Sequence, residues 1–208
     1  TIDVVSHGRV ILGIGAGWNV REHEAYGWEF PSMRERSDRL EEACELIRLL
    51  FHSEDRVDFN GQYYKLKQAA FAPRQGGDNP IPIMVGGTGE KRTLKTLAMY
   101  GDIMNVIASP ERVRHLNQVL EGHCEKVGRD PSEIQRTLHV PIRIIRDEEK
   151  AKKARGENDW AMMGSPQYVI DRIADFRECG ITEFTPQIRP QLPEVYQELD
   201  EEVFSAFD

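Results

Sequence analysis

The sequence predicts an α/β fold made of parallel βα units, of the type that closes into a (β/α)8 barrel. Short apolar runs alternate with helical patterns, and two of these runs are followed directly by glycine-rich segments. A complete barrel has eight such units in about 250 residues, and this chain of 208 residues offers about five. We therefore expect one barrel-type domain over residues 1–208 in which the first three strands are missing. The expected strands lie near residues 9–16, 81–86, 102–107, 137–145 and 183–188.

The first expected strand ends in Gly13, Gly15 and Gly17, which are spaced two residues apart. Side chains alternate between the two faces of a strand, so this spacing leaves one face bare while Leu12 and Ile14 pack on the other. A bare face at the carboxyl end of a barrel strand favours a flat cofactor. A simple turn is the other interpretation of such a run.

The second glycine-rich segment, Gly86 to Gly89, separates an apolar strand from a helical pattern that includes Leu94 and Leu97. Bare backbone N–H groups at the beginning of a helix form an anion site that suits a phosphate. Lys91 and Arg92 would fall in the first helical turn, where cations oppose the helix dipole unless an anion is bound. Together the two segments indicate a ring cofactor that carries a phosphate.

A dinucleotide site is the alternative for residues 13–17, but the match is poor. The segment reads GxGxG and lacks the third glycine of the GxGxxG fingerprint. Residues 21–28 are expected to form a polar loop before Pro31, where a dinucleotide site needs a helix. The sequence therefore disfavours this class of site.

Local signals place two further elements in the first half. Ser32 and Glu35 form a capping box that opens a helix running to Phe51. Asn60-Gly61 lies between apolar-alternating arms at 57–59 and 62–64, the pattern of a β-hairpin. We expect this hairpin to be an insertion over residues 53–70, outside the main sheet.

Helix boundaries are also marked in the second half of the chain. Ser109-Pro110 is expected to begin a helix that Gly128 ends, and Ser165-Pro166 another that ends at Gly180. A final helix is expected over 195–207.

Composition excludes several classes of function. There are 35 acidic and 27 basic residues, a net charge of −8, and no basic run, which argues against nucleic acid. No apolar run is long enough to span a membrane, and no signal peptide is recognisable. The cysteines are odd in number and far apart, which indicates reduced packing residues in a cytoplasmic protein.

The histidines show no metal-ligand spacing, so no metal site is expected. We interpret His23 as a group that packs within its loop. The remaining histidines, including His139, are scattered, and we interpret them as structural or surface residues.

Four segments together resemble the luciferase-like monooxygenase superfamily, in particular its branch of coenzyme F420-dependent oxidoreductases. These segments are Gly8–Trp18, Arg21–Gly27 with 36–49, 82–94 and 164–180. The resemblance covers nearly the whole chain in the right order. It implies a TIM-type barrel of the bacterial luciferase-like type that binds reduced deazaflavin or FMN at its carboxyl-terminal mouth.

The resemblance also implies site residues. In bacterial luciferase the position that matches Gly15 contacts the flavin ring, and in the family the loop that matches Gly86–Gly89 holds the cofactor phosphate. Trp18 would wall the ring or the substrate, or else pack under the loop that contains Trp28. The expected cofactor-binding residues are Gly15, Ala16, Gly17, Trp18, Asn19, Gly86, Gly87, Thr88, Gly89 and Arg92.

The resemblance implies an oxidoreductase that acts on a small organic molecule, by hydride transfer with F420 or by monooxygenation. An FMN-dependent monooxygenase is one alternative, and a non-catalytic half-barrel that pairs with a partner chain is another. Lys91, Arg92 and Lys95 would form a modest basic rim for the acidic tail of F420. We expect a homodimer.

Two departures from the family pattern narrow the range of activities that we expect. The F420-dependent glucose-6-phosphate dehydrogenases of the family carry a glutamate at the position of Trp18, and a lysine where this chain has residues 108–111. Oxidation of a sugar phosphate is therefore not expected. The family's catalytic histidines lie on strands that this sequence does not contain, so no catalytic acid is assigned.

Overall fold

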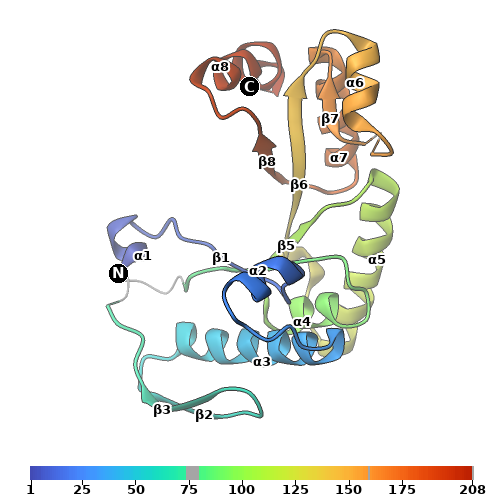
Figure 1. Ribbon diagram of the computed structural model, residues 1–208. Helices are drawn as coiled ribbons and strands as arrows, with labels where there is room; N and C mark the ends of the chain where they lie inside the picture. The colour runs from blue at the N-terminus through green and yellow to red at the C-terminus, as the bar shows by residue number, and fades with distance from the viewer. Residues whose placement is uncertain (74–79, 159, 208) are drawn as a thin grey trace. The chain divides into compact units, whose positions relative to one another are not determined.

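The computed structural model describes residues 1–73, 80–158 and 160–207, which form two compact units (Figure 1). The first unit contains residues 1–104 and 120–134, and the second contains the remainder. Strand β5 (Ile103–Val106) and helix α5 (Pro110–Val127) contribute residues to both.

In the main sheet, strands β1, β4 and β5 are neighbours in that order. Strand β1 (Leu12–Ile14) is parallel to β4 (Ile83–Gly86), with Leu12 opposite Ile83 and Ile14 opposite Val85. The strands expected near 9–16 and 81–86 are therefore present, although β1 is shorter than expected. A short helix α1 (Ile2–Val5) precedes them.

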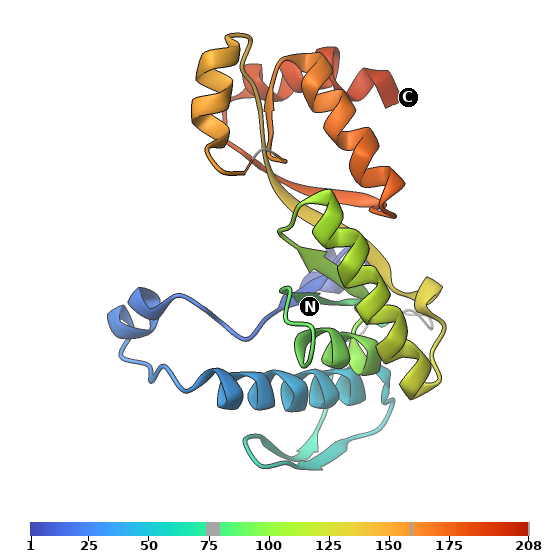
Figure 2. The same cartoon turned by 90° about the vertical axis from the view of Figure 1, so that its right-hand side faces the viewer.

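Helices α3 (Met33–His52) and α4 (Thr93–Tyr100) pack against each other (Figure 2). The Ser32 hydroxyl accepts a hydrogen bond from the N–H of Glu35 at 3.2 Å, so α3 begins at its expected cap. Leu40 and Cys44 are buried on one stripe of α3, and Leu94 and Leu97 of α4 are fully buried. Helix α4 begins at Thr93, four residues after Gly89, the last glycine of the second segment.

The prediction of a polar loop over residues 21–28 is wrong for its first part, because Val20–Ala25 form helix α2. The Asn19 side chain accepts from the N–H of Arg21 at 3.1 Å and donates to Glu22 at 2.8 Å. Asn19 and Glu22 thus form a variant of the capping box. The absence of a helix therefore does not count against a dinucleotide site, but the missing third glycine still does.

The expected hairpin is present as a separate antiparallel pair, but its second arm begins later than expected. Strand β2 (Val57–Asn60) pairs with β3 (Lys65–Ala69), and residues 61–64 form the loop. The Glu42 carboxylate of α3 accepts hydrogen bonds of 2.7–3.0 Å from the N–H groups of residues 62–64. These N–H groups therefore bind a side chain instead of a neighbouring strand.

The second unit is arranged around the long strand β6 (Gln135–Ile144) (Figure 1). Strand β8 (Glu183–Ile188) runs parallel to the first part of β6, with Thr137 opposite Glu183. Strand β7 (Met162–Gly164) runs parallel to its last part, with Ile142 opposite Met162. The three-residue strand β7 was not expected, because a run of three residues carries no periodicity.

Helices α6 (Glu148–Arg155), α7 (Pro166–Glu178) and α8 (Pro193–Glu202) complete this unit. The Ser165 hydroxyl accepts from the N–H of Tyr168 at 3.2 Å, and Gly180, with φ of 88°, lies just beyond the other end of α7. The expected final helix is shorter, because α8 ends at Glu202 and a 3₁₀ turn follows.

In the parts of the chain that the structure describes, no helix is both long and apolar enough to cross a membrane. Within the same parts, no group of three or more potential metal-ligating side chains comes together. The three cysteines are buried and form no disulfide, as packing residues are expected to do.

Candidate functional site

The two glycine segments lie side by side at the carboxyl ends of β1 and β4. A Cβ atom added to Gly15 would lie 3.4 Å from the carbonyl oxygen of Gly86. One added to Gly86 would lie 3.8 Å from the carbonyl oxygen of Ile14. The parallel pairing of β1 and β4 thus brings together residues that are about seventy positions apart in the sequence.

One face of β1 is bare at this point. A Cβ atom on Gly13 would meet no atom within 4 Å, and Gly13 is exposed. Leu12 and Ile14, on the opposite face, are half-buried. The geometry therefore has the open, side-chain-free face that the alternating glycines predict.

The segment Gly86 to Gly89 presents unused hydrogen-bond donors. Among the described residues, no group accepts a hydrogen bond from the backbone N–H of Gly87, Thr88 or Gly89. Gly87 has φ of 127°, a conformation that disfavours any other residue. A Cβ atom on Gly89 would lie 2.6 Å from the hydroxyl oxygen of Thr93 at the beginning of α4. Three bare donors close to the beginning of a helix suit the binding of an anion.

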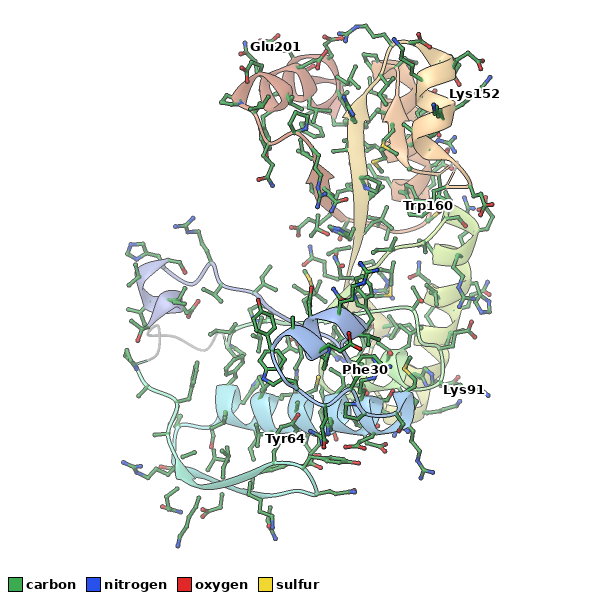
Figure 3. All side chains as sticks on the ribbon, in the orientation of Figure 1. Phe30, Tyr64, Lys91, Lys152, Trp160 and Glu201 are labelled. Carbon is green, nitrogen blue, oxygen red and sulfur yellow. The ribbon has the colours of Figure 1, made fainter. Side chains whose placement is uncertain are left out.

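The basic residues beside this segment are placed differently from expectation. Lys91 and Arg92 precede α4, which begins at Thr93, so neither lies in the first helical turn. Arg92 forms an ion pair with Asp38 of α3, and Lys95 with Glu41 at 2.9 Å. Lys91, labelled in Figure 3, is exposed and has no ion-pair partner in the described part of the chain. Of the three cations of the expected basic rim, only Lys91 therefore has an ammonium group without an ion-pair partner in the described residues.

Residues Gly17, Trp18 and Asn19 lead from β1 into α2. Gly17 has φ of 72°, and Trp18 is 83% exposed, so its indole does not pack under the loop that contains Trp28. The Asn19 side chain is occupied by the beginning of α2. His23 binds the carbonyl oxygen of Asn19 through Nδ1 at 2.9 Å, in agreement with a loop-packing role.

Arg36 of α3 borders the candidate site and is not among the residues predicted from the sequence. Its guanidinium donates to the carbonyl oxygens of Gly17 and Pro31 and lies 4.1 Å from the ring centroid of Phe30, which Figure 3 labels. Arg36 is only 8% exposed. The sequence does contain a signal for its burial, because Arg36 lies four residues before Leu40, on the apolar stripe of α3.

A cavity of about 540 Å³ lies between the end of β1 and α3. Gly15 and Ala16 border it together with Ile14, Arg36 and Tyr64. Arg39 also lines the cavity, and its hydrogen bonds to Glu35 raise its pKa above the ordinary arginine value. The cavity borders Gly15 of the bare face as well as Ile14 of the opposite face, so it lies at the carboxyl end of β1.

Comparisons with known proteins agree with this architecture. A family model described as luciferase-like monooxygenase matches residues 1–161. An F420-dependent glucose-6-phosphate dehydrogenase of Kineococcus radiotolerans is 36% identical over 166 residues, 77% of this chain and 47% of that protein. A 5,10-methylenetetrahydromethanopterin reductase of Archaeoglobus fulgidus is 31% identical over 175 residues, 83% of this chain and 50% of the relative.

The fold is also similar to that of a solved F420-dependent secondary alcohol dehydrogenase in complex with an F420-acetone adduct. The TM-score is 0.85 at 23% identity, over 100% of this chain and 73% of the other. This chain spans about half the length of the curated relatives it matches. Since the family model covers most of the sequence, this chain belongs to the luciferase-like monooxygenase family.

Proposed function

We propose that this chain belongs to an oxidoreductase that uses coenzyme F420. The observation that carries the proposal is the pairing of a bare strand end at Gly13 and Gly15 with free N–H donors at Gly87 to Gly89. A flat ring needs the first feature and a phosphate needs the second. The relatives described above are named for F420-dependent or related reactions, which supports this cofactor.

In this proposal each residue has a defined task. The backbone of Gly15, Ala16 and Gly17 lies against the ring, and exposed Trp18 walls one side of it. The N–H groups of Gly87, Thr88 and Gly89 bind the phosphate. Asn19 acts by fixing the beginning of α2, because its side chain is already hydrogen-bonded there. Arg92 can offer an anion only the donors that Asp38 leaves unused.

Bound F420 would supply the hydride acceptor or donor for the reaction. The protein's own contribution is orientation. Arg36 holds the carbonyl oxygens of Gly17 and Pro31, which fixes both ends of the segment that follows β1.

An FMN-dependent monooxygenase is the second candidate, because an anion site at Gly87 to Gly89 would suit either cofactor's phosphate. The acidic tail of F420 needs cations beyond the phosphate. Only Lys91 is free to supply one among Lys91, Arg92 and Lys95. The choice of F420 over FMN therefore rests on the relatives and less on the basic rim.

We further propose a small organic substrate other than glucose 6-phosphate, a homodimeric assembly and a cytoplasmic location. Glucose 6-phosphate is disfavoured because Trp18 occupies the position at which the sugar-phosphate enzymes of the family are expected to have a glutamate. The buried cysteines form no disulfide, which supports a reducing compartment.

The test is a fluorescence titration of the purified chain with F420, with FMN and with the deazaflavin riboside that lacks the phosphate. We expect micromolar binding of F420. Gly87→Glu should weaken it by about tenfold or more, because a carboxylate would face the phosphate. The same variant should have little effect on the phosphate-free riboside.

Gly156→Glu is the matched control. Gly156 also has a positive φ, 57°, and a Cβ atom there meets nothing within 4 Å, so this variant adds the same charge at another glycine whose conformation disfavours side chains. Equal weakening by both variants, or the absence of F420 binding to the folded chain, would contradict the proposal. Tighter binding of FMN than of F420 would favour the monooxygenase candidate.

A further inference from the structure

Arg36 differs from the other deeply buried arginines in the described part of the chain. Arg155, which is 8% exposed like Arg36, donates to the carboxylate of Glu148 at 2.9 Å. Arg129, 14% exposed, lies 3.1 Å from the carboxylate of Glu133. Arg36 forms no ion pair with a carboxylate of any described residue. Because buried charges in proteins are normally paired, Arg36 is an exception that needs a reason.

The partners that Arg36 does have are all uncharged. Its Nε–H group donates to the carbonyl oxygen of Pro31 at 3.1 Å, and Nη1 donates to that of Gly17. Nη2 lies 3.8 Å from the sulfur of Met33, and the ring of Phe30, labelled in Figure 3, stacks on the guanidinium. These groups stabilise the cation through their dipoles and the π face, but none of them cancels its charge.

The guanidinium of Arg36 also has unused hydrogen-bonding capacity. An arginine side chain has five N–H donors, and three of them account for the contacts to Pro31, Gly17 and Met33. Two N–H donors therefore have no partner among the described residues. A carboxylate is the group that best matches a free charge and two free donors of a guanidinium.

Arg36 lines a space in which a ligand can reach it. This is the cavity of about 540 Å³ at the carboxyl end of β1, within the size range of small-molecule sites. All of its lining residues belong to the first unit, and they include Gly15 and Ala16 of the proposed ring site. Tyr64 of the hairpin loop also lines it, and its hydroxyl has no hydrogen-bond partner in the described residues.

The other charged groups of the cavity favour a single negative charge on the ligand. The Arg39 guanidinium is matched by the Glu35 carboxylate at 2.7 Å. Glu29 lines the cavity without an ion-pair partner among the described residues, but it is exposed, so water screens its charge. A monoanion can pair with buried Arg36 and remain tolerable to Glu29. A dianion such as a phosphate meets stronger repulsion there.

We propose that Arg36 binds the carboxylate group of the substrate, and that this substrate is a small carboxylic acid. The bonds to the carbonyl oxygens of Gly17 and Pro31 hold the guanidinium in place, and its two remaining N–H donors bind the carboxylate. The assignment of the carboxylate to a substrate rests on the proposed oxidoreductase function. The anion site itself rests on the buried, unpaired guanidinium and its cavity.

The first test compares benzoate with benzamide, which have the same shape but differ in charge. The purified full chain is titrated without cofactor, by calorimetry and by following the Arg36 Nε–H resonance in a ¹H–¹⁵N spectrum. We expect benzoate to bind saturably with a dissociation constant of about 1 mM and to shift this resonance, and benzamide to bind about tenfold more weakly. Inorganic phosphate should bind more weakly than benzoate. Equal binding of benzoate and benzamide, tighter binding of phosphate, or no binding of benzoate would overturn the proposal.

Variants of Arg36 separate the anion site from the support of the backbone. Arg36→Met should weaken benzoate binding by about tenfold or more. Arg36→Lys keeps the charge but lacks the planar fork, so it should bind benzoate more tightly than Arg36→Met does. Arg34→Met is the matched control, since Arg34 lies on the same helix, is 87% exposed and does not line the cavity. Equal binding by the Met variants at positions 34 and 36 would contradict the site.

Glu29→Gln tests the same site without touching a buried residue. Glu29 is exposed, so the variant should fold like the parent chain. Removal of its charge should strengthen benzoate binding by about two- to threefold, because the repulsion of the carboxylate is lost. Unchanged or weaker binding of benzoate would contradict the electrostatic account of the cavity.

A last measurement distinguishes a substrate carboxylate from the carboxylates in the acidic tail of F420. The benzoate titration is repeated with saturating F420 and with the deazaflavin riboside, which has no tail. We expect benzoate to bind in the presence of either. Displacement of benzoate by F420 but not by the riboside would overturn the assignment to a substrate. Failure of F420 to bind would contradict the proposed function, whereas failure of benzoate to bind would contradict only this inference.

Discussion

Cys44 illustrates how burial changes the chemistry of one side chain. The thiol is completely buried on the apolar stripe of α3. Desolvation, together with the nearby charge of Glu41, raises the pKa of Cys44 to about 12. The thiol is therefore protonated and unreactive at neutral pH.

We predict that Cys44 makes the protein less stable as the pH rises from about 9 towards 12. In that range the unfolded chain loses the thiol proton and the folded chain keeps it, so the free energy of unfolding falls with pH. The loss should reach about 1 kcal/mol between pH 9 and 10. Urea unfolding at several pH values measures it, and Cys44→Ala should show a shallower decline than the parent chain. Identical slopes for the two proteins would contradict this prediction.

A side chain from outside α4 binds the carbonyl groups at the end of this helix. Arg129 is 14% exposed and donates to the carbonyl oxygens of Leu97, Ala98 and Gly101, the last at 2.6 Å. It also lies 3.7 Å from Asp102. A cation at the carboxyl end of a helix satisfies orphan carbonyl groups and complements the dipole.

We predict that Arg129→Met destabilises the chain by about 3 kcal/mol, because the carbonyl groups and Asp102 lose their shared partner. Lys126→Met is the control, since Lys126 is exposed near the end of α5. Urea midpoints of the two variants give the difference. Similar midpoints would mean that water replaces the guanidinium without cost.

The beginnings of α2 and β3 also depend on side-chain hydrogen bonds, in one case from nearby residues and in the other from a residue far away in the sequence. Asn19 and Glu22 set the beginning of α2, and this pattern is readable from sequence in hindsight. The beginning of β3 depends on Glu42, which lies about twenty residues earlier on α3. No local rule connects the turn at Asn60-Gly61 to that carboxylate.

Across the entire chain, residues 18–33 expose an unusual number of large apolar side chains. Trp18, Tyr26, Trp28 and Met33 are each 65–83% exposed. This surface supports the proposed homodimer.

We predict a concentration-dependent dimer in sedimentation equilibrium, with a dissociation constant that rises by about tenfold or more in Tyr26→Ser. Leu192→Ser is the control, because Leu192 is 48% exposed but lies in the second unit. A monomer at all concentrations, or equal effects of both variants, would contradict this interface.

The family resemblance, the alternation of strands and helices and the caps at Ser32, Ser165 and Gly180 were all predictable from sequence. Each depends on residues a few positions apart, whose spacing fixes the backbone geometry directly. The bare glycine face of β1 was predictable for the same reason, because it follows from the alternation of side chains along a strand.

Three contacts were not predictable: the ion pair of Arg92 with Asp38, the hydrogen bond from Arg36 to the Gly17 carbonyl, and that from Asn105 of β5 to Thr185 of β8. These contacts join residues that are 19 to 80 positions apart. Which partner a charged or polar group meets then depends on how helices and strands pack, and many partners are compatible with one local pattern. For this reason the spacing of glycines could indicate the candidate cofactor site, while only the folded chain determines which charged groups remain available there.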